Sequence, residues 1–164
     1  MSANGIWNFI QWVHYLALSL WVGGITFFSA VAAPSIHGSM ASRALAGQMV
    51  GKMLKRLNGI ELACCVLLLA TSFLSLRFVR ERNHWLGYLI LAIFLMGTLT
   101  AFYSFHLTPR LEAIKASVPT FDSLSVDHPS KIEFHRLHQL YVRLMGLNLV
   151  AGLLVLYGSV VLLK

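Results

Sequence analysis

Imidazole and carboxylate groups stand beside three of the apolar stretches of this sequence, and such groups can bind a metal ion. Glu61 lies at the start of one stretch and His106 at the end of another. His135 and His138 precede a third, and their i, i+3 spacing puts them on one side of a helix. Carboxylates and imidazoles on different helices of a bundle can form a transition-metal site. The sequence therefore predicts a metal site made of Glu61, His106, His135 and His138.

A second interpretation of the same residues needs no metal. Ferritin-like bundles use Glu-x-x-His pairs, whereas this chain offers only Glu133-x-His135 and a separate Glu61. Polar side chains at the water–membrane interface cost little free energy and require no functional role. In this interpretation Glu61 pairs with Lys55 or Arg110, and both interpretations stay open.

His14 is a separate candidate because it lies a third of the way along the first apolar stretch. It shares a helical face with Gln11 and Trp21. An intramembrane imidazole can ligate haem, relay protons or hydrogen-bond to another helix. The other histidines lie toward the opposite end of the spans or, for His84, in a short hairpin, so no second axial ligand is evident. We therefore expect His14 to face the interior, either as a haem ligand or as a helix-packing residue.

The elements that position these groups are apolar segments long enough to cross a membrane. They cover residues 6–33, 60–79, 85–107 and 144–163. A bilayer core needs about 20 mostly apolar residues per helix. With 57% hydrophobic and 12% charged residues, the 164-residue chain has little left for a soluble domain. We predict an all-α integral membrane four-helix bundle, with residues 1–164 as one domain and the first segment retained rather than cleaved as a signal peptide.

Two of the helices are expected to extend beyond the bilayer. Residues 42–57 have helix-forming composition and precede the second span, and Ser130-x-x-Glu133 resembles a capping box that starts the fourth helix well before Leu144. Pro109 predicts a kink or an end of the third helix just after its span. The extensions of helices two and four therefore lie on the same side as the first and third loops.

The distribution of basic residues predicts the topology. One side holds nine, at Arg43, Lys52, Lys55, Arg56, Arg110, Lys115, Lys131, Arg136 and Arg143. The other holds four, at Arg77, Arg80, Arg82 and Lys164. By the positive-inside rule both termini lie outside the cytoplasm, in a bacterial-type plasma membrane. The net charge of +7 then indicates contact with anionic lipid headgroups rather than nucleic acid.

Several short motifs, taken in order, resemble a known family. They are His14 with Trp21-Val-Gly-Gly, Ala33-Pro34, Thr108-Pro109-Arg110-Leu111 and Phe134-His135-Arg136-Leu137-His138 followed by Asn148-Leu149. This order resembles the four-helix membrane domain typified by the cisplatin-resistance-associated transmembrane protein. The resemblance implies a membrane bundle of unassigned activity with a loose association with soft metal compounds. The first helix also resembles copper-resistance D-type and protoporphyrinogen-oxidase J-type proteins, whose helix histidines can hold b-type haem.

Two functions follow as expectations. The first is a non-enzymatic membrane protein that binds a transition metal or b-type haem through histidine, in redox or metal handling. The second is an accessory subunit of a larger membrane protein complex, with no cofactor of its own. The lack of an evident partner for His14 favours the second. The sequence has no nucleotide-binding loop and no nucleophile motif, so no catalytic residues are assigned.

Overall fold

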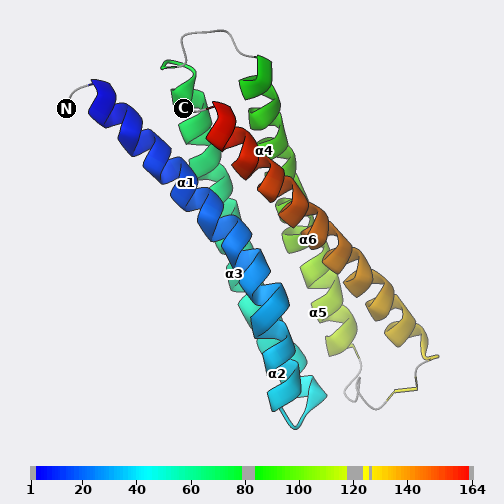
Figure 1. Ribbon diagram of the computed structural model, residues 1–164. Coiled ribbons are helices and arrows are strands. Elements are labelled where there is room, and N and C mark those ends of the chain that lie inside the picture. Colours follow the sequence, from blue (N-terminus) through cyan, green and yellow to red (C-terminus); the bar gives the residue numbers. More distant parts are fainter. Residues whose placement is uncertain (1–2, 79–83, 118–123, 126, 163–164) are drawn as a thin grey trace.

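The computed structural model describes residues 3–78, 84–117, 124–125 and 127–162, and every regular element among them is helical (Figure 1). In chain order the elements are α1 (Ala3–Phe27), η1 (Phe28–Ala32), α2 (Ala33–Ser39), α3 (Arg43–Ser75), α4 (His84–Phe102), η2 (Tyr103–Leu107), α5 (Thr108–Ala116) and α6 (Pro129–Leu162). The prediction of an all-α four-helix membrane bundle is confirmed, because the described residues contain four helices long and apolar enough to span a membrane.

The helical rods are longer than a bilayer is thick. α3 has 33 residues and α6 has 34. At 1.5 Å per residue each is about 50 Å long, whereas the hydrocarbon core is about 30 Å thick. The predicted extensions of the second and fourth helices are therefore present. The other rods are similar in length, with Asn4–Ser39 spanning 36 residues and His84–Ala116 spanning 33.

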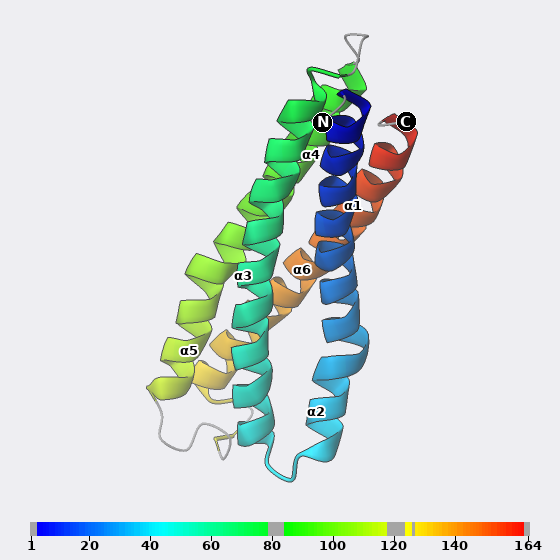
Figure 2. The same cartoon turned by 90° about the vertical axis from the view of Figure 1, so that its left-hand side faces the viewer.

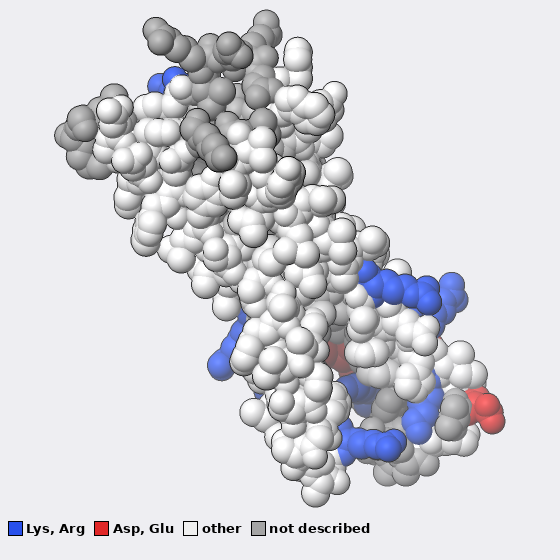
Figure 3. Space-filling view, viewed as in Figure 1, with Lys and Arg blue, Asp and Glu red and all other residues white. Residues whose placement is uncertain are grey.

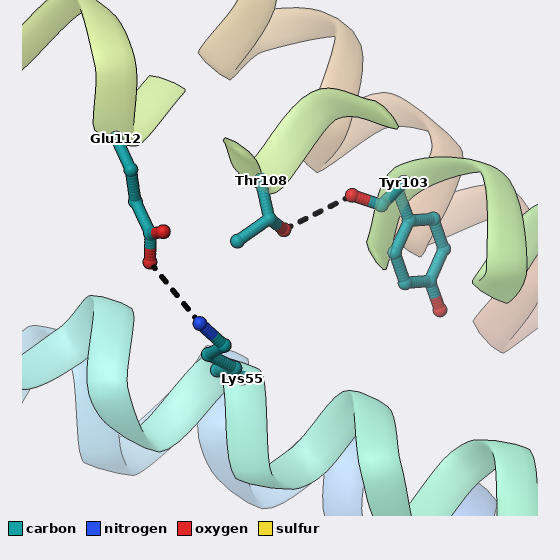
Figure 4. Close-up of polar contacts among 4 residues, drawn as sticks. All are labelled: Lys55, Tyr103, Thr108 and Glu112. Carbon is teal, nitrogen blue, oxygen red and sulfur yellow. Dashed lines mark hydrogen bonds and ion pairs between the residues drawn. The ribbon is translucent and has the colours of Figure 1, made fainter. Parts of the chain in front are cut away.

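These long rods continue through both prolines by widening into short π-helices. η1 ends two residues before Pro34, and η2 ends two residues before Pro109. A proline removes an N–H donor and its ring crowds the carbonyl one turn earlier, and a π segment is a common way to absorb such a disturbance. At η2, Thr108 donates both its backbone N–H and its hydroxyl to the Tyr103 carbonyl, the latter at 3.0 Å (Figure 4). The third helix therefore does not end at Pro109, which was one of the two predicted alternatives, but passes through a π segment into α5.

The start of α6 also differs from the expected capping box. The helix begins at Pro129, so Ser130 lies within its first turn. There the backbone N–H of Ser130 donates to His128 Nδ1 at 3.3 Å, and the His128 carbonyl accepts from the N–H groups of Lys131 and Ile132. His128, rather than Ser130, therefore satisfies the first backbone donors of the helix.

Each rod packs against two neighbours, in the order α1, α3, α4, α6 and back to α1 (Figures 1 and 2). Glycines bring α4 and α6 close to the other rods. A Cβ on Gly97 would come within 2.2 Å of Cys65 Sγ, and one on Gly152 within 2.9 Å of Val22 Cγ2. Such close approach is typical of packing between membrane helices, where small residues allow tight van der Waals contact.

The outward faces of the bundle are apolar, and charge gathers at one end. Trp12, Val66 and Leu154 are each at least 60% exposed, which suits contact with lipid rather than water. On the face shown in Figure 3, Lys and Arg side chains concentrate toward the end that carries α2 and α5. Both chain ends lie at the opposite end (Figure 1). Arg80, Arg82 and Lys164, which entered the topology prediction, lie outside the described residues.

Candidate functional site

The most polar site inside the bundle is built around Glu61 on α3. Its side chain is fully buried, with 0% of its surface exposed. Glu61 Oε2 accepts hydrogen bonds from the hydroxyl of Thr100 on α4, at 3.1 Å, and from the phenol of Tyr103 on η2. Both donors are also 0% exposed. The carboxyl group is therefore held between α3 and the third membrane-spanning helix, His84–Ala116, away from water.

Asn148 on α6 completes this site from a third direction. Its Nδ2 donates to Thr100 Oγ1 at 2.8 Å and to Tyr103 Oη at 3.1 Å, and its side chain is fully buried. We call Glu61, Thr100, Tyr103 and Asn148 the Glu61 cluster. Because its members come from three rods of the bundle, the cluster fixes how these rods are rotated against one another.

The cluster has spare acceptor capacity. Among the described residues, five buried side-chain nitrogen or oxygen atoms have no hydrogen-bond partner, and two of these are Glu61 Oε1 and Asn148 Oδ1. A buried polar atom left without a partner costs about 1–3 kcal/mol. Two unpaired oxygens at one carboxyl-containing cluster make it a candidate site for a proton, a cation or a small polar ligand.

No described basic side chain neutralises Glu61, so the predicted pairing with Lys55 or Arg110 does not form. Lys55 instead approaches Glu112 on α5, with Nζ 3.8 Å from Oε1 (Figure 4). Both of these side chains are well exposed, so their ion pair contributes little stability. Glu61 is thus a buried carboxyl whose described hydrogen-bonding partners are neutral.

A second tyrosine lies between the Glu61 cluster and the basic end of the bundle. Tyr141 on α6 is 2% exposed, and its ring packs against that of Tyr103 with centroids 4.9 Å apart. Its hydroxyl donates to Asn58 Oδ1 at 2.8 Å. Asn58 lies one helical turn before Glu61 on α3. The two aromatic rings and this hydrogen bond therefore close the cluster toward the basic end.

Thr100 and Tyr103 were not among the site residues predicted from the sequence. They stand three residues apart in the third apolar stretch, where a threonine and a tyrosine also occur in ordinary packing roles. The i, i+3 spacing of these two polar side chains was a usable signal, because it puts them on one face of the helix. Asn148 hydrogen-bonds to Thr100 on a neighbouring helix, as expected for an amide within a membrane span.

His14 faces the interior, as predicted, and forms a second buried polar site. It is 0% exposed, its Nδ1 lies 2.8 Å from Thr71 Oγ1 on α3, and its Nε2 lies 3.0 Å from Ser159 Oγ on α6. The Thr71 hydroxyl donates to the Leu67 carbonyl at 2.8 Å, so it accepts from His14 Nδ1–H. A neutral imidazole whose Nε2 accepts from Ser159 fits this network. An iron bound at His14 would have to displace one of these hydrogen bonds.

The other predicted metal ligands do not meet at one point. His106 is exposed and stacks on Phe102, with ring centroids 5.5 Å apart. His138 stacks on Phe134 at 5.9 Å, and His135 is exposed on the same helix. Across the described ranges, no group of three or more His, Cys, Asp or Glu side chains is placed to hold a metal ion. The structure therefore leaves Glu61 apart from the three histidines.

These features define a multi-pass α-helical membrane protein with an ionisable group buried in its bundle. Within that class, the model of a family described as a domain of unknown function (DUF4149) matches residues 16–118. The match covers more than half of the chain, so the protein belongs to the DUF4149 family. It includes Glu61, Thr100 and Tyr103, whereas Asn148 lies beyond it. No curated protein and no solved structure matches the chain.

Proposed function

We propose that this protein is a non-enzymatic membrane protein that binds a proton at Glu61 inside the bundle. The observation that carries this proposal is the fully buried carboxyl with one unpaired oxygen and no described basic partner. A carboxylate moved from water into an apolar interior is strongly disfavoured unless something neutralises it. Within a membrane, such groups mark proton or ion pathways.

The hydrogen bonds of the Glu61 cluster can be completed in both protonation states. As a carboxylate, Glu61 Oε2 accepts from both Tyr103 and Thr100. As a carboxylic acid, Glu61 donates from Oε2 to Tyr103, Tyr103 donates to Thr100 at 2.9 Å, and Thr100 donates back to Glu61. Only hydroxyl hydrogens rotate between these arrangements. The cluster can therefore gain and lose a proton without moving its heavy atoms.

Labelling with dicyclohexylcarbodiimide tests this proposal, because the reagent enters apolar regions and reacts with protonated carboxyl groups. We expect Glu61 to be labelled in the membrane-embedded protein and the labelling to fall as pH rises. Glu61→Gln should abolish that adduct, and Glu133→Gln, at an exposed carboxyl, should not. Absence of a Glu61 adduct at every pH would contradict the proposal. Protection by an added metal cation at low pH would show a cation site instead.

A second candidate, an accessory subunit without a cofactor, is favoured by the His14 site. Both imidazole nitrogens hydrogen-bond to side chains of α3 and α6, which gives this histidine a structural role that needs no ligand. The haem and transition-metal predictions are tested by the visible spectrum and metal content of the purified protein. A Soret band that disappears in His14→Ala would establish haem and would set this candidate aside.

We also propose, from the motifs around Trp21, Pro109 and His138, that the protein groups with the membrane domain typified by the cisplatin-resistance-associated transmembrane protein. The cysteines of this chain bear on any link to soft metals. Cys64 and Cys65 are free and buried, and Cys65 packs against Gly97. A soft metal compound would therefore have to enter the bundle before it reached a thiol. Mass spectrometry after exposure to a platinum(II) compound, with Cys64→Ser and Cys65→Ser as controls, tests for such adducts.

A further inference from the structure

A groove lies between α5 and α6 at the basic end of the bundle. It encloses about 480 Å³, a volume that suits a small polar group. Its lining includes Arg110 from α5 and Glu133, Arg136, Leu137, Leu140 and Arg143 from α6. All three arginines are exposed, so the groove opens to the surroundings of the bundle.

The lining of the groove carries more positive than negative charge. Its three arginines face a single lining carboxylate, Glu133. Within the described part of the chain, none of the three guanidinium groups forms an ion pair, and the pair that does form there is Lys55–Glu112. A guanidinium group presents a planar set of donors that matches phosphate oxygens, often with two parallel hydrogen bonds. The chemistry of the lining therefore selects a phosphate group.

The depth of the arginines indicates where that phosphate comes from. Arg143 directly precedes the apolar stretch 144–163, so it lies at the level where headgroups meet the acyl chains. Arg136 lies two turns earlier on α6, about 10 Å farther from the bilayer centre. The headgroup layer is roughly 5–8 Å thick on each side, so the two arginines bracket it. Leu137 and Leu140 add an apolar wall between them.

We propose that this groove binds the headgroup phosphate of an anionic phospholipid. The charge attracts the anion, the guanidinium geometry recognises its phosphate, and the position at the edge of the apolar stretch favours a lipid over a soluble anion. Such binding would hold α5 against α6 at the end of the bundle nearest the Glu61 cluster. The inference does not depend on whether Glu61 binds a proton.

Native mass spectrometry of the detergent-purified protein tests this site, with phosphatidylglycerol and phosphatidylcholine as probes. We expect phosphatidylglycerol to be retained at least about 10-fold more tightly, because its headgroup carries a net negative charge, whereas the choline cation of phosphatidylcholine offsets the charge of its phosphate and is repelled by the arginines. The double variant Arg136→Gln/Arg143→Gln should lose this preference. Arg43→Gln/Lys52→Gln removes the same charge from the same end of the bundle, outside the groove, and should keep it. Circular dichroism confirms that both variants stay helical.

Each other outcome would overturn the proposal. Equal losses in the two double variants would show diffuse surface electrostatics rather than a site. Retention of phosphatidylglycerol and phosphatidylcholine to the same degree by the unaltered protein would remove the selectivity. Displacement of the lipid by millimolar inorganic phosphate, with the phosphate then bound at the groove, would assign the site to a soluble anion.

A further variant has an expected result of its own. Arg143→Lys, which keeps the charge but not the planar donor set, should weaken binding less than the double variant.

Discussion

The bundle contains two buried polar clusters on the same pair of helices, and they differ in how completely their hydrogen bonds are made. Thr71 follows Glu61 by ten residues on α3, and Ser159 follows Asn148 by eleven on α6. At 1.5 Å per residue the His14 and Glu61 clusters are therefore about 15 Å apart along the bundle. Both central side chains are 0% exposed. Burial alone thus does not distinguish them.

The difference lies in the unpaired atoms. His14 has a partner on each ring nitrogen, so its network is complete with a neutral imidazole. The Glu61 cluster keeps one carboxyl oxygen and one amide oxygen without partners among the described residues. A fully satisfied buried network rigidifies a core, whereas a partly satisfied one has capacity for a ligand. On this ground we propose a structural role for His14 and a proton-binding role for Glu61.

Replacing His14 should have the largest effect on stability. His14→Ala leaves Thr71 and Ser159 without their buried partner and creates a cavity, so we expect a loss of about 3 kcal/mol. Thermal unfolding in detergent, followed by circular dichroism, measures this loss. A change below about 0.5 kcal/mol would contradict the structural role, because a surface substitution has an effect of that size.

Tyr103→Phe should have an intermediate effect, because it removes one hydroxyl from the Glu61 cluster. Glu61 loses a donor and Asn148 loses an acceptor, so we expect a loss of about 1–2 kcal/mol in the same assay. Carbodiimide labelling of Glu61 should persist, since the carboxyl stays buried. Tyr141→Phe is the matched control, because it removes a hydroxyl that bonds Asn58 rather than Glu61. Loss of the Glu61 adduct in Tyr103→Phe, with labelling kept in Tyr141→Phe, would contradict this expectation.

Thr108→Val should have a smaller effect and probes how η2 positions Tyr103. The variant removes the hydroxyl that donates to the Tyr103 carbonyl, while the backbone N–H of residue 108 still donates to it. We expect a loss of about 0.5–1 kcal/mol in the unfolding assay. Thr98→Val is the control, since its hydroxyl bonds the Phe94 carbonyl within a regular α-helix. Equal losses would show that the π segment has no special dependence on Thr108.

The spans could be predicted from the sequence, whereas the partners inside the bundle could not. Span length follows from bilayer thickness, and the inward direction of His14 follows from the cost of an imidazole in lipid. The choice of Thr71 and Ser159 as its partners depends on how each rod is rotated. At η2 a wider turn changes the rotation of the residues that follow it. The composition and the periodicity of the sequence do not predict this rotation.

The predicted metal site shows the same limit. Glu61 and the histidines were predicted to meet because they lie at similar depth on different helices. Depth alone, however, does not determine the direction in which a side chain points. Glu61 points into the bundle, while His106 and His138 lie exposed beside aromatic rings. Residues at one level can thus face the core or the surroundings, and the packing of neighbouring rods decides which.

Glu61→Gln should have the smallest effect on stability and the clearest effect on proton binding. The amide keeps the shape of the side chain and an acceptor for Tyr103 and Thr100, and it carries no charge. We expect the free energy of unfolding to change by less than about 1 kcal/mol, in contrast to His14→Ala. A loss as large as that of His14→Ala would show that the carboxyl serves chiefly as a structural cross-link.

The most direct measurement of the central claim is the pH-dependent infrared difference spectrum of the membrane-embedded protein. We predict a C=O stretching band of a protonated, buried carboxylic acid that is lost as pH rises, is absent in Glu61→Gln and persists in Glu133→Gln. A spectrum in which Glu61→Gln changes no carboxylic acid band at any pH would contradict proton binding at Glu61.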